Sequence, residues 1–95
     1  MATEREELMD LLKAKYPKMF LRTTEEFNGS EGGIWTSGED GLPAKDEFPL
    51  FEYYAEDFNE KRYIIGVHKE IYNFLTRHGW YGEWNDPGTI MFWEI

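Results

Sequence analysis

The chain contains no cysteine. This absence excludes disulfide bonds, a thiolate nucleophile and zinc sites with cysteine ligands. No stretch approaches the ~20 consecutive apolar residues that span a bilayer. The opening residues, MATEREELMD, are acidic where a signal peptide has a basic start and an apolar stretch. We therefore expect a cytoplasmic protein that has no membrane partner.

Familiar motifs for nucleotide, metal and catalytic chemistry are also missing. Five glycines fall between residues 29 and 41, but the stretch GSEGGIWTSGEDG lacks a phosphate-loop spacing and its acids would repel a phosphate. The EF-hand calcium spacing, H-E-x-x-H and G-x-S-x-G do not occur either. We expect no cofactor and no metal site. An enzyme is not favoured, because no nucleophile, base and orienting group can be nominated together.

Basic residues are scarce in the middle of the chain. Residues 23–60 contain eleven acids and one base and sum to −10, whereas residues 1–22 sum to +1 and residues 61–95 to zero. Clustered acids disfavour direct nucleic-acid binding and favour a basic partner, although they could also serve only to keep the protein soluble. The candidate partner-binding residues are Glu39, Asp40, Asp46, Glu47, Glu56 and Asp57.

Aromatic residues, in contrast, are abundant. The seven Phe, four Trp and six Tyr side chains can bury enough area to offset the chain entropy lost on folding. A chain of 95 residues can form one hydrophobic core but not two. Residues 1–95 should therefore form a single domain.

Apolar periodicity predicts two helices. One side of the first carries Leu8, Leu11, Leu12 and Tyr16. Thr3 and Glu6 have the spacing of a capping box at its start, and Pro17 should end it at about Lys15. One side of the second carries Val67, Ile71, Phe74, Leu75 and His78. Gly79 stands where a left-handed residue would end this helix and bring the next residue, a tryptophan, against its apolar side.

The remaining apolar segments are predicted to form strands. They are residues 19–27, 33–37, 49–55, 80–84 and 89–95. Residues 38–47 should form an extended acidic loop, and NDPG should form a type II turn with a positive φ at Gly88. We therefore expect an α+β fold of order α-β-β-β-α-β-β. Its small, mainly antiparallel sheet of about four or five strands should have both helices packed on one face.

The last predicted strand, TIMFWEI, is apolar on both sides. Ile90 and Phe92 alternate with Met91 and Trp93, so each face of the sheet needs a cover. The helices cover one face, and the chain between residues 38 and 62 is long enough to cover the other. A second copy is the alternative cover, because an open edge at this C-terminal strand would allow a homodimer.

The two histidines are predicted to be structural. His78 closes the apolar side of the second helix and should be partly buried and hydrogen-bonded, whereas His68 should be exposed at the start of that helix. An alternative interpretation places His78, Trp80, Tyr81 and Glu83 around a pocket for a small ligand or substrate.

These observations favour a small acidic, non-enzymatic interaction protein. We expect it to bind a basic protein partner through the region 23–60, through aromatic residues beside it, or through both. Two alternatives stay open. One is an inhibitor whose carboxylates take the place of DNA phosphates, which resembles small acidic phage inhibitors in charge alone. The other is a small enzyme or ligand-binding domain that uses the pocket at the second helix.

Overall fold

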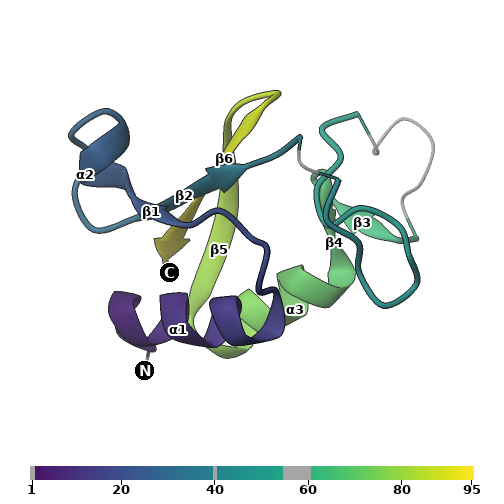
Figure 1. Ribbon diagram of the computed structural model, residues 1–95, viewed down its shortest axis with the longest axis horizontal. Coiled ribbons are helices and arrows are strands. Elements are labelled where there is room, and N and C mark those ends of the chain that lie inside the picture. The colour runs from purple at the N-terminus through teal and green to yellow at the C-terminus, as the bar shows by residue number, and fades with distance from the viewer. Residues whose placement is uncertain (1, 40, 55–60) are drawn as a thin grey trace.

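The computed structural model describes residues 2–39, 41–54 and 61–95 and confirms the α+β class (Figure 1). Its elements, in chain order, are α1 (Arg5–Lys15), β1 (Arg22–Thr23), α2 (Thr24–Phe27), β2 (Ile34–Ser37), β3 (Tyr63–Ile64), β4 (Val67–His68), α3 (Lys69–Arg77), β5 (Trp80–Asp86) and β6 (Thr89–Glu94). The expected order is broadly correct. The chain adds the short helix α2 and replaces the third predicted strand with the pair β3–β4.

The main sheet contains four strands in the order β1-β2-β6-β5, and each neighbouring pair is antiparallel. β6 is therefore a central strand that pairs with β2 on one side and with β5 on the other. The open edge at residues 89–94 that the alternative homodimer required is absent, because both sides of the strand already pair within the chain. β3 and β4 form a separate two-stranded sheet.

The hydrophobic core lies between the main sheet and the helices α1 and α3, which lie below the sheet in Figure 1. Ile34, Ile90 and Phe92 point from the sheet into this core and are fully buried. The residues that meet them include Leu8 and Leu12 of α1, Ile71 and Leu75 of α3, and Leu50 and Phe51 of the segment before β3. Packing of both helices on one face agrees with their predicted apolar sides.

Helix α1 ends at Lys15 as predicted, and the Tyr16 N–H still donates to the Leu12 carbonyl. Its predicted capping box is wrong. The N-cap residue is Glu4, and no side chain caps the helix. Thr3 has a different partner, because its hydroxyl lies 2.8 Å from Nδ1 of His78 at the far end of the chain. A tertiary contact has thus taken the place of the local one.

Helix α3 ends as its sequence predicts. Gly79 has a φ of +79°, and its N–H donates to the carbonyl of Thr76. The chain then turns inward, so that Trp80 is only 2% exposed and lies in the same core cluster as Leu75. A left-handed glycine after the last helical turn is a common helix ending.

Two predicted strands are largely absent. Residues 19–27 form a strand only at β1, and α2 follows at once, with the Glu26 carboxylate accepting a hydrogen bond from the Thr23 N–H at 3.3 Å. In the described part of 49–55, Pro49 and Phe51 make only isolated bridges, to Pro43 and Val67. Proline has no N–H for a ladder, and the backbone donors that follow it bond to separate segments of the chain.

The turn between β5 and β6 falls at Pro87 and Gly88 as predicted, but its type differs. Gly88 does not have a positive φ. Instead, the Asp86 side chain accepts a hydrogen bond from the Gly88 N–H at 2.9 Å. Aspartate commonly bonds to the backbone two residues on, and this bond fixes the turn without left-handed geometry.

The second face of the sheet, opposite α1 and α3, is not covered by the described part of the 38–62 segment. Leu50 and Phe51 of that segment enter the core on the helix side instead. The rings of Phe20 and Phe27 pack against Trp35 on the second face, with ring centres 4.9 and 4.8 Å apart. The described part of the segment therefore does not provide the expected cover, because Leu50 and Phe51 contribute to the main core.

Candidate functional site: an acidic aromatic cleft

The structure describes three of the six acids that the sequence singled out, and these three lie in different settings. Asp40, Glu56 and Asp57 lie outside the described residues. Glu39 lines a surface cleft, Asp46 belongs to a hydrogen-bonded network, and Glu47 is an exposed residue with a φ of +72°. Of the three described acids, only Glu39 therefore lines a cleft with a carboxylate that makes no ion pair within the described part of the chain.

Asp46 holds the loop after β2 against α3. Its carboxylate accepts hydrogen bonds from Nε of Arg62 at 2.8 Å, from Nε2 of His68 at 3.0 Å and from the Phe48 N–H at 3.0 Å. Partial desolvation acts to raise its pKa, but the bonds from Arg62, His68 and Phe48 outweigh it and lower the pKa to about 2. This carboxylate is occupied within the chain, so we assign it a structural role.

The expectation that His68 is exposed is wrong, because its side chain is 6% exposed. Its Nδ1 accepts a hydrogen bond from the Glu70 N–H at 3.0 Å and caps α3. The proton of the neutral ring is therefore on Nε2, which donates it to Asp46. Both ring nitrogens of His68 are therefore used in bonds within the chain.

The structure does not bring the alternative pocket residues together. The side chain of Trp80 is in the core, where its indole N–H donates to the Thr3 carbonyl at 2.7 Å. Tyr81 and Glu83 point to the opposite face of the sheet, because side chains alternate along β5. His78 is half-buried, as predicted, and bonds to Thr3. These four residues do not line one cavity.

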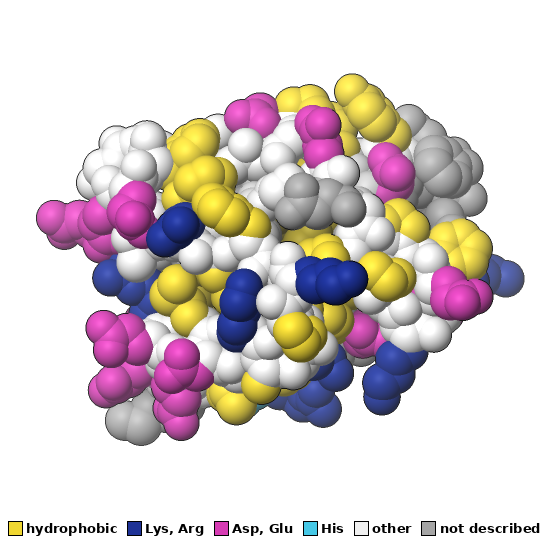
Figure 2. Space-filling model, viewed as in Figure 1, with side chains coloured by type: hydrophobic (Ala, Val, Ile, Leu, Met, Phe, Trp, Pro, Cys, Tyr) yellow, Lys and Arg dark blue, Asp and Glu magenta, His cyan; other side chains and the backbone are white. Residues whose placement is uncertain are grey.

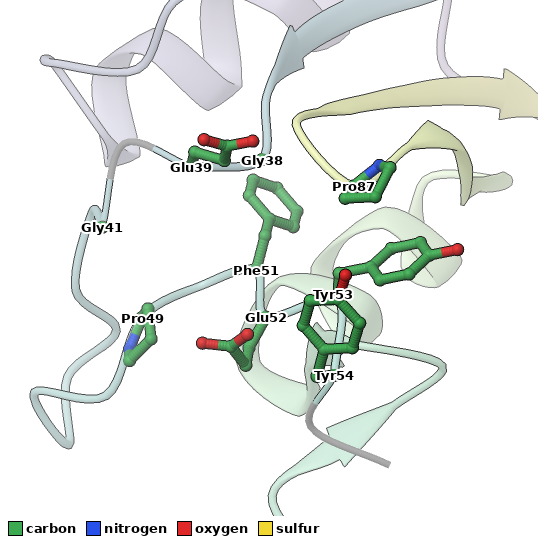
Figure 3. A pocket seen from close by; sticks show the side chains of 9 residues that line it. All are labelled: Gly38, Glu39, Gly41, Pro49, Phe51, Glu52, Tyr53, Tyr54 and Pro87. Atoms are coloured by element: carbon green, nitrogen blue, oxygen red, sulfur yellow. The ribbon is translucent and has the colours of Figure 1, made fainter. Parts of the chain in front are cut away.

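A cleft of about 300 Å³ opens between the end of β2, the segment 49–54 and the β5–β6 turn. Figure 3 shows the Phe51 ring pointing toward the backbone of Gly38 and Glu39, with Pro87 beside it. The described residues that line the cleft are Gly38, Glu39, Gly41, Pro49, Phe51, Glu52, Tyr53, Tyr54 and Pro87. Its volume is at the lower end of the ~300–1,000 Å³ that is usual for ligand sites.

Backbone bonds fix the floor of this cleft. Phe51 makes a bridge to Val67, and the Glu52 N–H donates to the Gly66 carbonyl at 2.8 Å. Gly66 has a φ of +73°, and a Cβ there would lie 2.7 Å from the Glu52 carbonyl oxygen. A glycine is therefore required where the two segments meet.

Aromatic packing supports the wall of the cleft. The Tyr53 ring meets Trp84 edge-on at 5.2 Å, and Tyr54 meets Tyr53 at 5.0 Å. Trp84 is itself held by a hydrogen bond from its indole N–H to the Ile65 carbonyl at 2.8 Å. The floor residue Phe51 is 7% exposed, whereas Tyr53 and Tyr54 are 41% and 58% exposed. The wall thus presents aromatic surface to solvent.

The charged side chains that line the cleft are both acidic, and neither forms an ion pair within the described part of the chain. Within the described ranges, neither Glu39 nor Glu52 has a cationic group within 4.0 Å. Burial, together with the charges of Glu52 and Asp46, raises the pKa of the nearby Tyr63. Two carboxylates and two exposed aromatic rings thus line one cleft, and both kinds of group attract a cation.

The sequence carried a weak signal for this cleft. The residues EYY at 52–54 place an acid next to two tyrosines within the acidic region. Strand alternation puts Glu52 and Tyr53 on opposite faces, so a periodic pattern gives no reason to group them. Their grouping depends on the irregular backbone after Pro49, which no periodic pattern predicts.

Other classes of site gain no support from the described residues. Over residues 2–39, 41–54 and 61–95, no group of three or more histidine, aspartate or glutamate side chains could hold a metal ion. No helix of that part of the chain is long and apolar enough to cross a membrane. Comparison of the chain with known protein families, curated proteins and solved structures found no match.

Proposed function

We propose that this protein is a binding module for a basic protein partner and that its acidic aromatic cleft receives a lysine or arginine side chain. One observation carries the proposal. Glu39 and Glu52 line the cleft without a cationic partner among the described residues, and the exposed rings of Tyr53 and Tyr54 line the same cleft. The cleft also belongs to the region of the sequence that carries the whole negative excess.

The chemistry of a cationic side chain matches both parts of the cleft. A cation over an exposed aromatic ring contributes ~0.5–1 kcal/mol, and an exposed ion pair contributes ~0.2–1 kcal/mol. The excess of acids also steers a basic partner toward this region and raises the association rate. We expect modest affinity for a single side chain and higher affinity for a partner with several basic residues.

The DNA-mimic alternative has less support. It requires acids that project as one ladder on a continuous face. Glu25 is paired with Arg5 at one end of the molecule, and Asp46 is paired with Arg62 and His68 near α3. Figure 2 shows Asp and Glu side chains around the margin of the visible face, interrupted by Lys and Arg.

The first test compares two charge-matched variants in binding to a basic peptide. The probe is a fluorescent peptide of alternating lysine and glycine, with a glutamine–glycine peptide as its neutral counterpart. Glu39→Gln/Glu52→Gln should weaken binding of the lysine peptide several-fold and at most ~30-fold, because two exposed ion pairs are lost. Added salt should weaken binding to the unsubstituted protein in the same direction.

The control is Glu6→Gln/Glu7→Gln, which removes the same charge from exposed positions of α1. This control should change the affinity less than about twofold, because surface charges beyond the ~8 Å Debye length of physiological salt are largely screened. Equal losses in the two variants would show that only net charge matters and would reject the cleft. Equal binding of the lysine and glutamine peptides would reject the proposal altogether.

A further inference from the structure

The second face of the main sheet carries a row of side chains with opposite charges at its ends. Cross-strand register places Arg22 opposite Trp35, Trp35 opposite Met91, and Met91 opposite Glu83. Directly opposed residues of antiparallel strands point to the same side of a sheet. The row therefore crosses all four strands from a cation on β1 to an anion on β5. We call this side the outer face.

The two charged side chains at the ends of the row form no ion pair in the described part of the chain. Neither Arg22 nor Glu83 has an oppositely charged group within 4.0 Å there. Arg22 lies over the ring of Phe20, 5.5 Å from its centre. Both side chains are exposed. They stand at opposite ends of the row, and the two middle members of the row, Trp35 and Met91, are apolar.

Aromatic residues cover the area between and beside these charges. Trp93 lies opposite Tyr81 in the adjacent row, and Trp35 is flanked by Phe20 and Phe27. The two phenylalanines and Tyr81 are 37–38% exposed. In Figure 2, hydrophobic side chains gather beside α2 and over β1 and β2, next to Lys and Arg side chains. A large apolar patch with a polar rim is typical of an interaction surface.

Two polar atoms of this face are also left without partners. Nε1 of Trp35 and Nε1 of Trp93 are buried and have no hydrogen-bond partner among the described residues. An indole N–H that is removed from water usually finds an acceptor. Both nitrogens are already covered by the chain's own side chains, so they offer no contact to a partner on this face.

We infer that the outer face binds a second copy of the same chain. A twofold axis that runs parallel to the strands, midway between β2 and β6, reverses the order of the row. It places Arg22 of each copy opposite Glu83 of the other and Trp35 opposite Met91. Two sheets packed in this way form a sandwich with a self-complementary interface. This route to a homodimer uses the face of β6 and needs no open edge.

Charge complementarity favours a second copy over an unrelated partner. A partner of one charge sign would match one end of the row and repel the other. The reversed row of a second copy matches both charged ends at once. Each copy carries a formal net charge of −9, so the assembly should form most readily at physiological salt, where repulsion beyond ~8 Å is screened.

The test is a charge-swap series measured by sedimentation velocity over a wide range of protein concentration. The unsubstituted protein should show a concentration-dependent shift from monomer to dimer. Arg22→Glu and Glu83→Arg should each raise the dissociation constant at least about tenfold, because each places two pairs of like charges in contact. The double variant Arg22→Glu/Glu83→Arg should restore the dissociation constant to within about threefold, because the pairs re-form with reversed sign.

Rescue by the double variant separates an interface contact from a loss of folding, and circular dichroism of each variant checks the fold directly. Lys18→Glu is the matched charge reversal, at an exposed lysine after α1 that makes no side-chain hydrogen bond within the described part of the chain, and it should leave the dimer unchanged. A monomer at millimolar concentration would overturn the inference. Single variants that dimerise like the unsubstituted protein, or a double variant that stays as weak as the single ones, would also overturn it.

Discussion

At the scale of single residues, His68 is held by more hydrogen bonds than His78, although its position at the start of a helix indicates an exposed side chain. His68 is buried and uses both ring nitrogens, whereas His78 is half-buried and makes one side-chain hydrogen bond. His68→Gln should lower the free energy of unfolding by ~1–3 kcal/mol, and His78→Gln by ~0.5–1.5 kcal/mol. Urea unfolding of the two variants measures the difference. A larger loss in His78→Gln would contradict the described network.

The carboxylate that bonds to His68 gives a second prediction, on pH. Asp46 has a pKa of about 2 in the folded chain, below its ordinary value of 3.8. A lowered pKa stabilises the folded state above about pH 4, and this contribution is lost as the pH falls toward 2. Asp46→Asn should therefore be less stable at neutral pH and lose less stability on acidification.

Unfolding midpoints between pH 7 and pH 2 test this prediction. The neighbouring variant Glu47→Gln is the control, because Glu47 is exposed and accepts no hydrogen bond among the described residues. It should retain the acid dependence of the unsubstituted protein. If Asp46→Asn kept that same dependence, the Asp46 network would not contribute to folding.

At the scale of elements, two helices end in a left-handed glycine but differ in what surrounds it. Gly29 follows α2 with a φ of +82° and has open space around it, whereas Gly79 follows α3 with a φ of +79°. A Cβ at Gly79 would lie 2.8 Å from Cα of Ala2. Gly29→Ala should cost ~1–2 kcal/mol for the backbone conformation alone, and Gly79→Ala should cost clearly more.

The extra loss at Gly79 has a structural reason. The residue next to Ala2, Thr3, donates its N–H to the His78 carbonyl, and its own carbonyl accepts from the Trp80 indole at 2.7 Å. Displacing Ala2 disturbs both bonds. Urea unfolding compares the variants, and trypsin cleavage at Arg5 reports release of the N-terminal segment. Equal stability losses in the two variants would contradict this docking.

At the scale of the whole molecule, the cleft and the outer face are separate surfaces. The cleft lies beyond the end of β2 and at the β5–β6 turn, whereas the row from Arg22 to Glu83 crosses the opposite side of the sheet from the core. Substitutions at distant sites without shared partners usually have additive effects. Arg22→Glu should therefore leave affinity for the lysine peptide within about twofold. Glu39→Gln/Glu52→Gln should leave dimerisation unchanged, and strong coupling between the two measurements would show that the surfaces overlap.

The sequence by itself determined the features that rest on neighbouring residues. The helical periodicity of α1 and α3, the glycine ending at Gly79 and the turn at Pro87 and Gly88 follow from local geometry, and the structure contains them. The distribution of charge along the chain was also readable, since it requires no fold. These features involve contacts within a few residues, for which spacing and residue type are sufficient evidence.

Tertiary structure alone decided which distant residues meet. Thr3 bonds to His78, Asp46 bonds to His68, and β6 is central because β2, far away in the chain, pairs with it. Several pairings of the same strands satisfy the same apolar alternation, so periodicity cannot choose among them. The choice depends on how all the side chains fill one core together. That packing placed Phe51 under the cleft and left Trp35 and Trp93 on the outer face.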